Sequence, residues 1–266
     1  MIDWAVSSHS ETLEIAEGDG VRRLTLWRPT SLNAFDEKLQ RDFLGAVTAA
    51  ANDDTVRCVL ITGRGRAFSA GADLALDDVG PEVRLAPRTE RELTRFYNPI
   101  VRGLREMRKP VVAAVNGPAV GVGCAVAVAC DHVVGARSSS FTLAFSRVGL
   151  TLDGGASLLV GARVGFGRAS RMALLAERVD AHTAFSWGLI DAVVDDAVLA
   201  DHAESVARKL AAGPTEAYAA TKHSLNAALL HRLEDAFEVE VAGQTALVDG
   251  PGFRTAITRF STGAKG

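Results

Sequence analysis

Two glycine-containing loops carry the residues whose types and spacing are best suited to chemistry. The first runs from Gly63 to Leu74 and the second from Asn116 to Cys124. Each follows a short apolar run typical of a buried strand, and each offers small residues that let a ligand approach the backbone closely. Taken singly, each loop is also explained as a tight turn that packs a helix closely against a sheet.

The two loops together favour a site for a negatively charged oxygen. Ala72 lies in the first loop, and Val122 lies in the second, where an apolar helix is predicted to begin. A helix N-terminus exposes unpaired N–H groups that suit an anion. Two convergent amides are what a developing oxyanion requires, and one such donor is worth about 3 kcal/mol of transition-state stabilisation. We therefore expect the amides of Ala72 and Val122 to bind one oxygen.

The elements that must position these loops alternate between strands and helices. Short apolar runs predict buried strands at 58–61, 111–115 and 132–135, and a hairpin is predicted from 12–15 and 21–27. Helical periodicity spans 36–51. Buried strands separated by helical stretches predict an α/β fold with a parallel or mixed sheet.

The remaining segments differ in composition from this core. Residues 75–95 are charged, contain two prolines and follow the first loop, so we expect a mobile loop or helix over a site. From about Arg168 the chain is helical in pattern, with helices predicted at 169–177, 181–187, 197–212, 215–232 and 233–248. We therefore divide the chain into a core, residues 1–195, and a helical region, residues 196–266, that packs on the core or on a neighbouring subunit.

Composition and charge argue against several classes of function. The net charge is −3, so no basic field is present and nucleic acid is not an expected partner. The six histidines show no paired spacing, and no metal site is expected. Three cysteines lie in apolar runs, so we expect them to be buried and free, which fits a reducing compartment. No basic-then-apolar leader and no run long enough to span a membrane is seen, so we expect a cytoplasmic protein without membrane contact.

Five passages occur in an order known from one enzyme family. They are Arg28–Phe35, Arg66–Leu74, Lys109–Gly117 continuing to Gly121–Cys124, Ser186–Asp191 and Phe253–Phe260. With them the chain resembles the crotonase superfamily, also called the enoyl-CoA hydratase/isomerase family. The resemblance implies a spiral of ββα units with a C-terminal helical trimerisation region, and an assembly as a homotrimer or a dimer of trimers. It also implies an acyl-CoA substrate, with coenzyme A as part of the substrate and no separate cofactor.

The resemblance assigns roles by motif position. The amides of Ala72 and Val122 correspond to the family's oxyanion hole, the backbone of Ala70 to the position that meets adenine, and Phe260 to an aromatic residue that closes the CoA site. The neighbouring residues expected to contact CoA are Arg28, Ser69, Gly71, Asp73, Leu74 and Gly121. From the residues alone, Asp73 also fits a helix cap, and Ser69 has no visible histidine–acid partner for a hydrolase triad.

The acids of the family's hydratases are missing. Their two glutamate positions correspond here to Ala125 and Phe145. One acid remains: the stretch 148–156 resembles the family's Gly-Leu-x-Pro-Asp-x-Gly segment, with Leu152 in place of proline, and places Asp153 where several isomerase-like members have an active-site acid. Read without the family, Asp153 fits a cap for the helix that follows. Leu150, Leu152, Phe141 and Phe145 are the expected apolar wall around it.

Three functions follow from these assignments. In the first, Asp153 moves a proton along an unsaturated acyl-CoA and shifts its double bond. A raised pKa in an apolar pocket helps it act both as base and as acid. In the second, the chain is a hydratase that draws an acid from 75–95, where Glu82, Glu90 and Glu92 lie. In the third, it binds acyl-CoA with little turnover.

Overall fold

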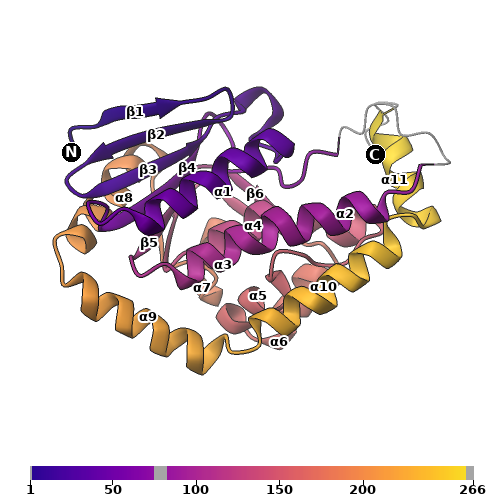
Figure 1. The fold of residues 1–266 in the computed structure, drawn as a ribbon. Helices are drawn as coiled ribbons and strands as arrows, with labels where there is room; N and C mark the ends of the chain where they lie inside the picture. Colours follow the sequence, from indigo (N-terminus) through magenta and orange to yellow (C-terminus); the bar gives the residue numbers. More distant parts are fainter. Residues whose placement is uncertain (1, 75–82, 262–266) are drawn as a thin grey trace.

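The computed structural model (Figure 1) describes residues 2–74 and 83–261, with side chains as far as Thr258. In this part of the chain, seven strands form the main sheet. The strand order is β1-β2-β3-β4-β5-β7-β10. Their bounds are Ala5–His9, Leu13–Gly18, Val21–Leu26, Cys58–Gly63, Val111–Val115, His132–Ala136 and Ala192–Val194. The first three strands pair antiparallel, and every pair from β3 to β10 is parallel. The predicted α/β class and the predicted hairpin are confirmed.

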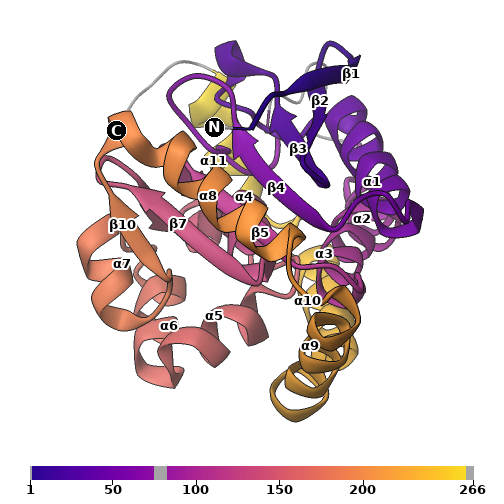
Figure 2. The same ribbon diagram turned by 90° about the vertical axis from the view of Figure 1, so that its left-hand side faces the viewer.

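The central strands are buried on both faces. On β4, Val59 and Ile61 belong to a core shared with α1 and α3, whereas Cys58 and Leu60 contact a second cluster under α8. Figure 2 shows α8 (Leu199–Ala211) lying across one face of the sheet. Burial on two faces explains why these strands are continuous apolar runs rather than alternating ones.

Helices cover both faces and extend beyond the sheet. Their bounds are α1 Glu37–Asn52, α2 Ala86–Glu92, α3 Asn98–Glu106, α4 Val122–Ala129, α5 Ala156–Val164, α6 Phe166–Leu174, α7 Ala181–Trp187, α9 Thr215–Leu229, α10 Leu233–Leu247 and α11 Pro251–Ser261. A π-helix, Leu93–Tyr97, joins α2 to α3. In the described part of the chain, no helix is both long enough and apolar enough to cross a membrane.

The helix α1 shows how local sequence sets an element. Asp36 precedes it in extended conformation, and the Asp36 side chain accepts a hydrogen bond from the Leu39 N–H at 2.8 Å. This cap satisfies one of the N–H groups that a helix start leaves unpaired. Leu39, Phe43 and Val47 then form the buried face. The predicted span 36–51 is therefore one residue early at each end.

Several boundaries differ from the prediction. The helix predicted at 169–177 begins three residues earlier, after Gly165, whose φ of +79° ends the preceding helix. The helix predicted at 215–232 ends at Leu229. Strand β1 and helix α11 are not predicted from the sequence. All five residues of β1 are exposed, so it carries no periodic apolar signal.

A small second sheet holds the second glycine loop. Its strands are β6 (Pro118–Val120), β8 (Ser140–Thr142) and β9 (Val179–Asp180). Strand β6 leads through Gly121 directly into α4. This sheet therefore fixes the point at which the N-terminus of α4 begins.

Candidate active site

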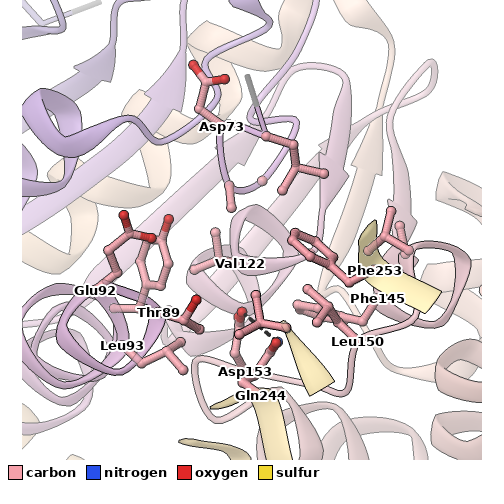
Figure 3. Close-up of a pocket in the computed structure, with 18 of the residues that line it drawn as sticks. Asp73, Thr89, Glu92, Leu93, Val122, Phe145, Leu150, Asp153, Gln244 and Phe253 are labelled. Atoms are coloured by element: carbon pink, nitrogen blue, oxygen red, sulfur yellow. Dashed lines mark hydrogen bonds between the residues drawn. The ribbon is translucent and has the colours of Figure 1, made fainter. Parts of the chain in front are cut away.

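A cavity of about 420 Å³ lies where the two glycine loops meet α2 and the C-terminal helices (Figure 3). Eight of the residues predicted to act in catalysis or to contact CoA line it, namely Ala70, Gly71, Ala72, Asp73, Leu74, Gly121, Val122 and Asp153. Apolar side chains supply much of the rest, including those of Leu93, Phe145, Leu150, Val248 and Phe253. The amides predicted to bind an oxyanion and the predicted acid thus share one cavity.

The two glycine loops are paired to each other. Val120 N–H donates to Ser69 O at 2.9 Å, and Ser69 N–H donates to Pro118 O at 3.1 Å. Gly71 has φ of +93°, and a Cβ there would lie 2.8 Å from Val120 O. Only glycine combines this left-handed conformation with so close an approach. The pairing sets Ala72 beside the N-terminus of α4.

The N–H groups of Ala72 and Val122 donate no hydrogen bond within the described ranges 2–74 and 83–261. Phe35 forms a parallel bridge with Ala72, in which Phe35 N–H donates to Gly71 O and Phe35 O accepts from Asp73 N–H. The bridge uses the groups on either side of Ala72, so the Ala72 N–H is directed away from Phe35. Val122 is the first residue of α4, where no intrahelical partner exists. Both amides therefore remain available to an anionic oxygen.

Asp153 is a buried acid at this cavity. It is 6% exposed. Its Oδ2 accepts a hydrogen bond from Gln244 Nε2 at 3.2 Å, and Oδ1 has no hydrogen-bond partner among the described residues. Burial raises the pKa of Asp153 well above its ordinary value, and the nearby charges of Glu240 and Glu92 raise it further. A carboxyl group in this setting keeps its proton to higher pH than an exposed one does.

Two amides with no hydrogen-bond acceptor among the described residues and one buried acid therefore lie at the same cavity. The sequence profile described as enoyl-CoA hydratase/isomerase matches residues 16–264. The chain belongs to the enoyl-CoA hydratase/isomerase family.

Relatives within this family carry different activities in their names. The chain is 39% identical over 244 residues to the "1,2-epoxyphenylacetyl-CoA isomerase" of Escherichia coli strain K12, covering 91% of this chain and 92% of that protein. It is 35% identical over 255 residues to a "probable enoyl-CoA hydratase" of Rhodobacter capsulatus, covering 96% of each.

A solved structure agrees with the predicted fold. The crystal structure of an enoyl-CoA hydratase from Mycobacterium avium subsp. paratuberculosis K-10 superposes with a TM-score of 0.85, at 39% identity, covering 94% of this chain and 96% of that one. The predicted crotonase fold is confirmed.

Helix α10 holds the turn that carries Asp153. Glu240 accepts hydrogen bonds from Gly155 N–H at 2.7 Å and Ser157 N–H at 2.9 Å. Gln244, one helical turn later, donates to Thr151 O at 2.7 Å as well as to Asp153. Glu240 thus caps α5 from another helix, because Gly155 offers no side chain for that role. Neither residue is singled out in the sequence, where a polar pair four apart on a helix resembles a solvated face.

Replacing Glu240 by alanine is expected to lower the free energy of unfolding by about 2 kcal/mol, because two N–H groups at the start of α5 lose their acceptor. Urea unfolding followed by circular dichroism measures the change. Glu238→Ala, on the exposed side of the same helix, is the control and is expected to change stability by less than about 0.5 kcal/mol. Equal losses in both variants would contradict the capping role.

Two predicted CoA contacts, Arg28 and Ser69, are not among the residues that line the cavity. Arg28 is engaged elsewhere: Nη1 donates to Asp73 Oδ2 at 2.9 Å, and Nε lies 3.2 Å from Asp36 Oδ2. Ser69 is fully buried, and its Oγ donates to Asn33 O and accepts from Gly71 N–H. These contacts stabilise the first loop. The side chain of Phe260 lies outside the described residues, so its role stays a prediction.

The structure confirms part of the predicted apolar wall and part of the prediction for residues 75–95. Phe145 and Leu150 line the cavity, whereas Phe141 is buried in the main core and Leu152 packs against that core. Helix α2 covers the cavity, as expected for part of 75–95. Of its acids, Glu92 lines the cavity and Glu90 is exposed, while Glu82 lies outside the described residues.

The raised pKa of Asp153 has a consequence for stability. A group whose pKa is raised by folding stabilises the protein fully below its unfolded pKa, which is about 3.9 for aspartate. That stabilisation is lost as pH rises towards the folded pKa. Asparagine does not titrate. The melting temperature of Asp153→Asn is therefore expected to rise relative to that of wild type as pH increases above the unfolded pKa of aspartate. Thermal unfolding by circular dichroism over a pH series measures the difference. A difference independent of pH would show that Asp153 is not perturbed.

Proposed function

We propose that this member of the family is an isomerase that shifts a double bond in an unsaturated acyl-CoA thioester. The observation that carries the proposal is Asp153, a buried carboxyl group with a raised pKa in the same cavity as two unpaired amides. One group that exchanges protons meets the minimum need of a proton shift, provided the intermediate is stabilised.

The proposed reaction begins with the thioester oxygen bound between the N–H groups of Ala72 and Val122. Loss of a proton from the carbon next to the thioester leaves its electron pair as an enolate, whose negative oxygen these two amides stabilise. Return of a proton two carbons away, with Asp153 as the exchanging group, completes the shift. No atom is gained or lost, so substrate and product have the same mass.

Hydration is less well supported by the side chains of this chain. The two positions that resemble the hydratase glutamates are Ala125, which is fully buried, and Phe145, an apolar wall residue. Neither moves a proton, and adding water needs one group to activate it and another to protonate carbon. The 35% identity to a "probable enoyl-CoA hydratase" nevertheless makes hydration the second candidate.

The coenzyme portion is proposed to run along the first loop as part of the substrate, with no separate cofactor. Ala70, Gly71 and Leu74 line the cavity, and the small size of the first two leaves room for close approach. We further propose that the protein assembles as a homotrimer or a dimer of trimers through its C-terminal helices, as the family resemblance implies. Light scattering tests this assembly.

The E. coli relative supplies a second candidate substrate of the same class. Its name describes isomerisation of 1,2-epoxyphenylacetyl-CoA, a reaction that also conserves mass. This compound therefore belongs in the substrate panel beside linear 3-enoyl-CoA and 2-enoyl-CoA thioesters.

The test is incubation with that panel, followed by mass and ultraviolet detection. An isomerase gives a conjugated 2-enoyl thioester from a 3-enoyl-CoA without a change of mass. A product that gains water, with loss of conjugated absorbance from a 2-enoyl-CoA, would establish the hydratase instead. Tight CoA binding by calorimetry, with no product from any thioester, would show a binding protein.

A further inference from the structure

A second carboxyl group, that of Glu92, also lines the cavity. Glu92 is the last residue of α2 and lines the cavity, whereas Asp153 comes from the turn before α5 (Figure 3). The Glu92 side chain is 21% exposed, and its Oε1 accepts a hydrogen bond from Arg88 Nε at 2.7 Å. Arg88 lines the cavity as well. The chain thus places carboxyl groups on two walls of one cavity.

The backbone changes form at Glu92. Residues Leu93–Tyr97 form a π-helix, closed by a hydrogen bond from Asn98 N–H to Leu93 O. Leu93 and Tyr97 also line the cavity. Single π-turns occur frequently at functional sites. The cavity side of this segment therefore carries an irregular turn, a carboxylate and two buried wall residues in succession.

The two carboxyl groups have opposite surroundings. Asp153 is buried, has no cation among its described contacts and has a raised pKa, which favours its protonated form. Glu92 is less deeply buried, and its carboxylate forms an ion pair with the Arg88 guanidinium. Two carboxyl groups whose environments differ in this way are suited to be the acid and the base of one reaction.

We propose that the isomerase uses both groups, with Glu92 removing the first proton and Asp153 delivering the second. This inference rests on the proposed function and divides its proton transfers between two residues. Asp153 is the more deeply buried of the two and is therefore assigned to the carbon farther from the thioester.

The steps balance without a further reactant. Glu92 takes a proton from the carbon next to the thioester, and the electron pair of that C–H bond passes into the enolate held by Ala72 and Val122. The O–H bond of Asp153 then breaks, its proton forms the new C–H bond two carbons away, and the double bond moves. After product leaves, Glu92 releases a proton to water and Asp153 takes one from water.

Isotope labelling of the wild-type protein tests whether two different groups remove and deliver the proton. In deuterium oxide, each molecule of 2-enoyl-CoA formed from a 3-enoyl-CoA is expected to carry one deuterium at the newly protonated carbon, at the earliest times sampled. A single group that returned the proton it removed would leave the substrate's own hydrogen in much of the product. That second result would overturn the proposal, and it needs no variant to fold.

Substitution provides the second arm of the test. Glu92→Gln keeps the shape of the side chain and is expected to lower kcat for isomerisation by about 100-fold with KM nearly unchanged. Glu90→Gln is the matched control, because Glu90 lies on the same helix and is exposed. Glu92→Asp, which keeps a carboxylate, is expected to recover part of the rate. Wild-type kcat in Glu92→Gln would overturn the assignment.

Different results would overturn the role of Glu92 and the proposed function. If Asp153→Asn is inactive while Glu92→Gln retains full rate, the proposed function stands and the role of Glu92 falls. If the wild-type protein forms no 2-enoyl-CoA from any 3-enoyl-CoA, the proposed function falls, and the role of Glu92 falls with it.

Discussion

Replacing Asp153 by asparagine is expected to lower kcat for the isomerisation of a 3-enoyl-CoA by about 10² to 10⁴-fold, the usual contribution of a positioned acid or base. Asparagine has the same shape and can still accept the hydrogen bond from Gln244, but it cannot exchange a proton. Substrate binding uses the loops and the apolar wall, so KM is expected to change little. The appearance of conjugated thioester absorbance measures the rate.

The control for this substitution removes a carboxylate far from the cavity. Asp201→Asn lies on an exposed position of α8 and is expected to keep the wild-type rate. If Asp153→Asn also keeps that rate, the proton must be moved by another group, and the proposed function loses the observation that carries it.

Removing the Val122 amide is the other change with a large expected effect. Val122→Pro deletes the N–H at the first position of α4, where proline fits the helix and no hydrogen bond within the described fold is lost. Loss of one oxyanion donor costs about 3 kcal/mol, or roughly 10² to 10³-fold in kcat. Steady-state kinetics with the same 3-enoyl-CoA measures it.

Comparison with Val122→Ala isolates the amide from the side chain. Val122 is buried, so both variants lose packing, but only the proline variant loses the N–H. Calorimetric titration with CoA checks that the loop still folds. Equal kcat in the proline and alanine variants would show that this amide does not stabilise the reaction.

Much of the fold is predictable from the sequence because its strands leave an unambiguous pattern. Runs such as Val111–Val115 are apolar at every position since helices cover both faces of the sheet. The glycine loops are predictable for a related reason: Gly71 and Gly121 have positive φ, and a side chain on Gly71 would meet the neighbouring loop. Strand β1 leaves no such trace, because all its residues are exposed.

The candidate site is less completely predictable, because its support comes from distant parts of the chain. Glu240 and Gln244 reach Asp153 and its turn from a helix more than 80 residues later, and a helical pattern does not reveal which polar face is buried. Glu92 and Glu90 are equivalent in sequence, and only the path of α2 separates the cavity wall from solvent. The sequence position of Arg28 predicts a contact with CoA, and in the fold its guanidinium forms ion pairs with Asp73 and Asp36.

The most direct test of the account is a crystal structure of the Asp153→Asn variant with an unreacted 3-enoyl-CoA bound. The thioester oxygen is predicted to lie within about 3.2 Å of the backbone nitrogens of both Ala72 and Val122, with the carbon that receives the second proton next to residue 153. A thioester oxygen bound elsewhere, or by only one of the two amides, would contradict the central claim.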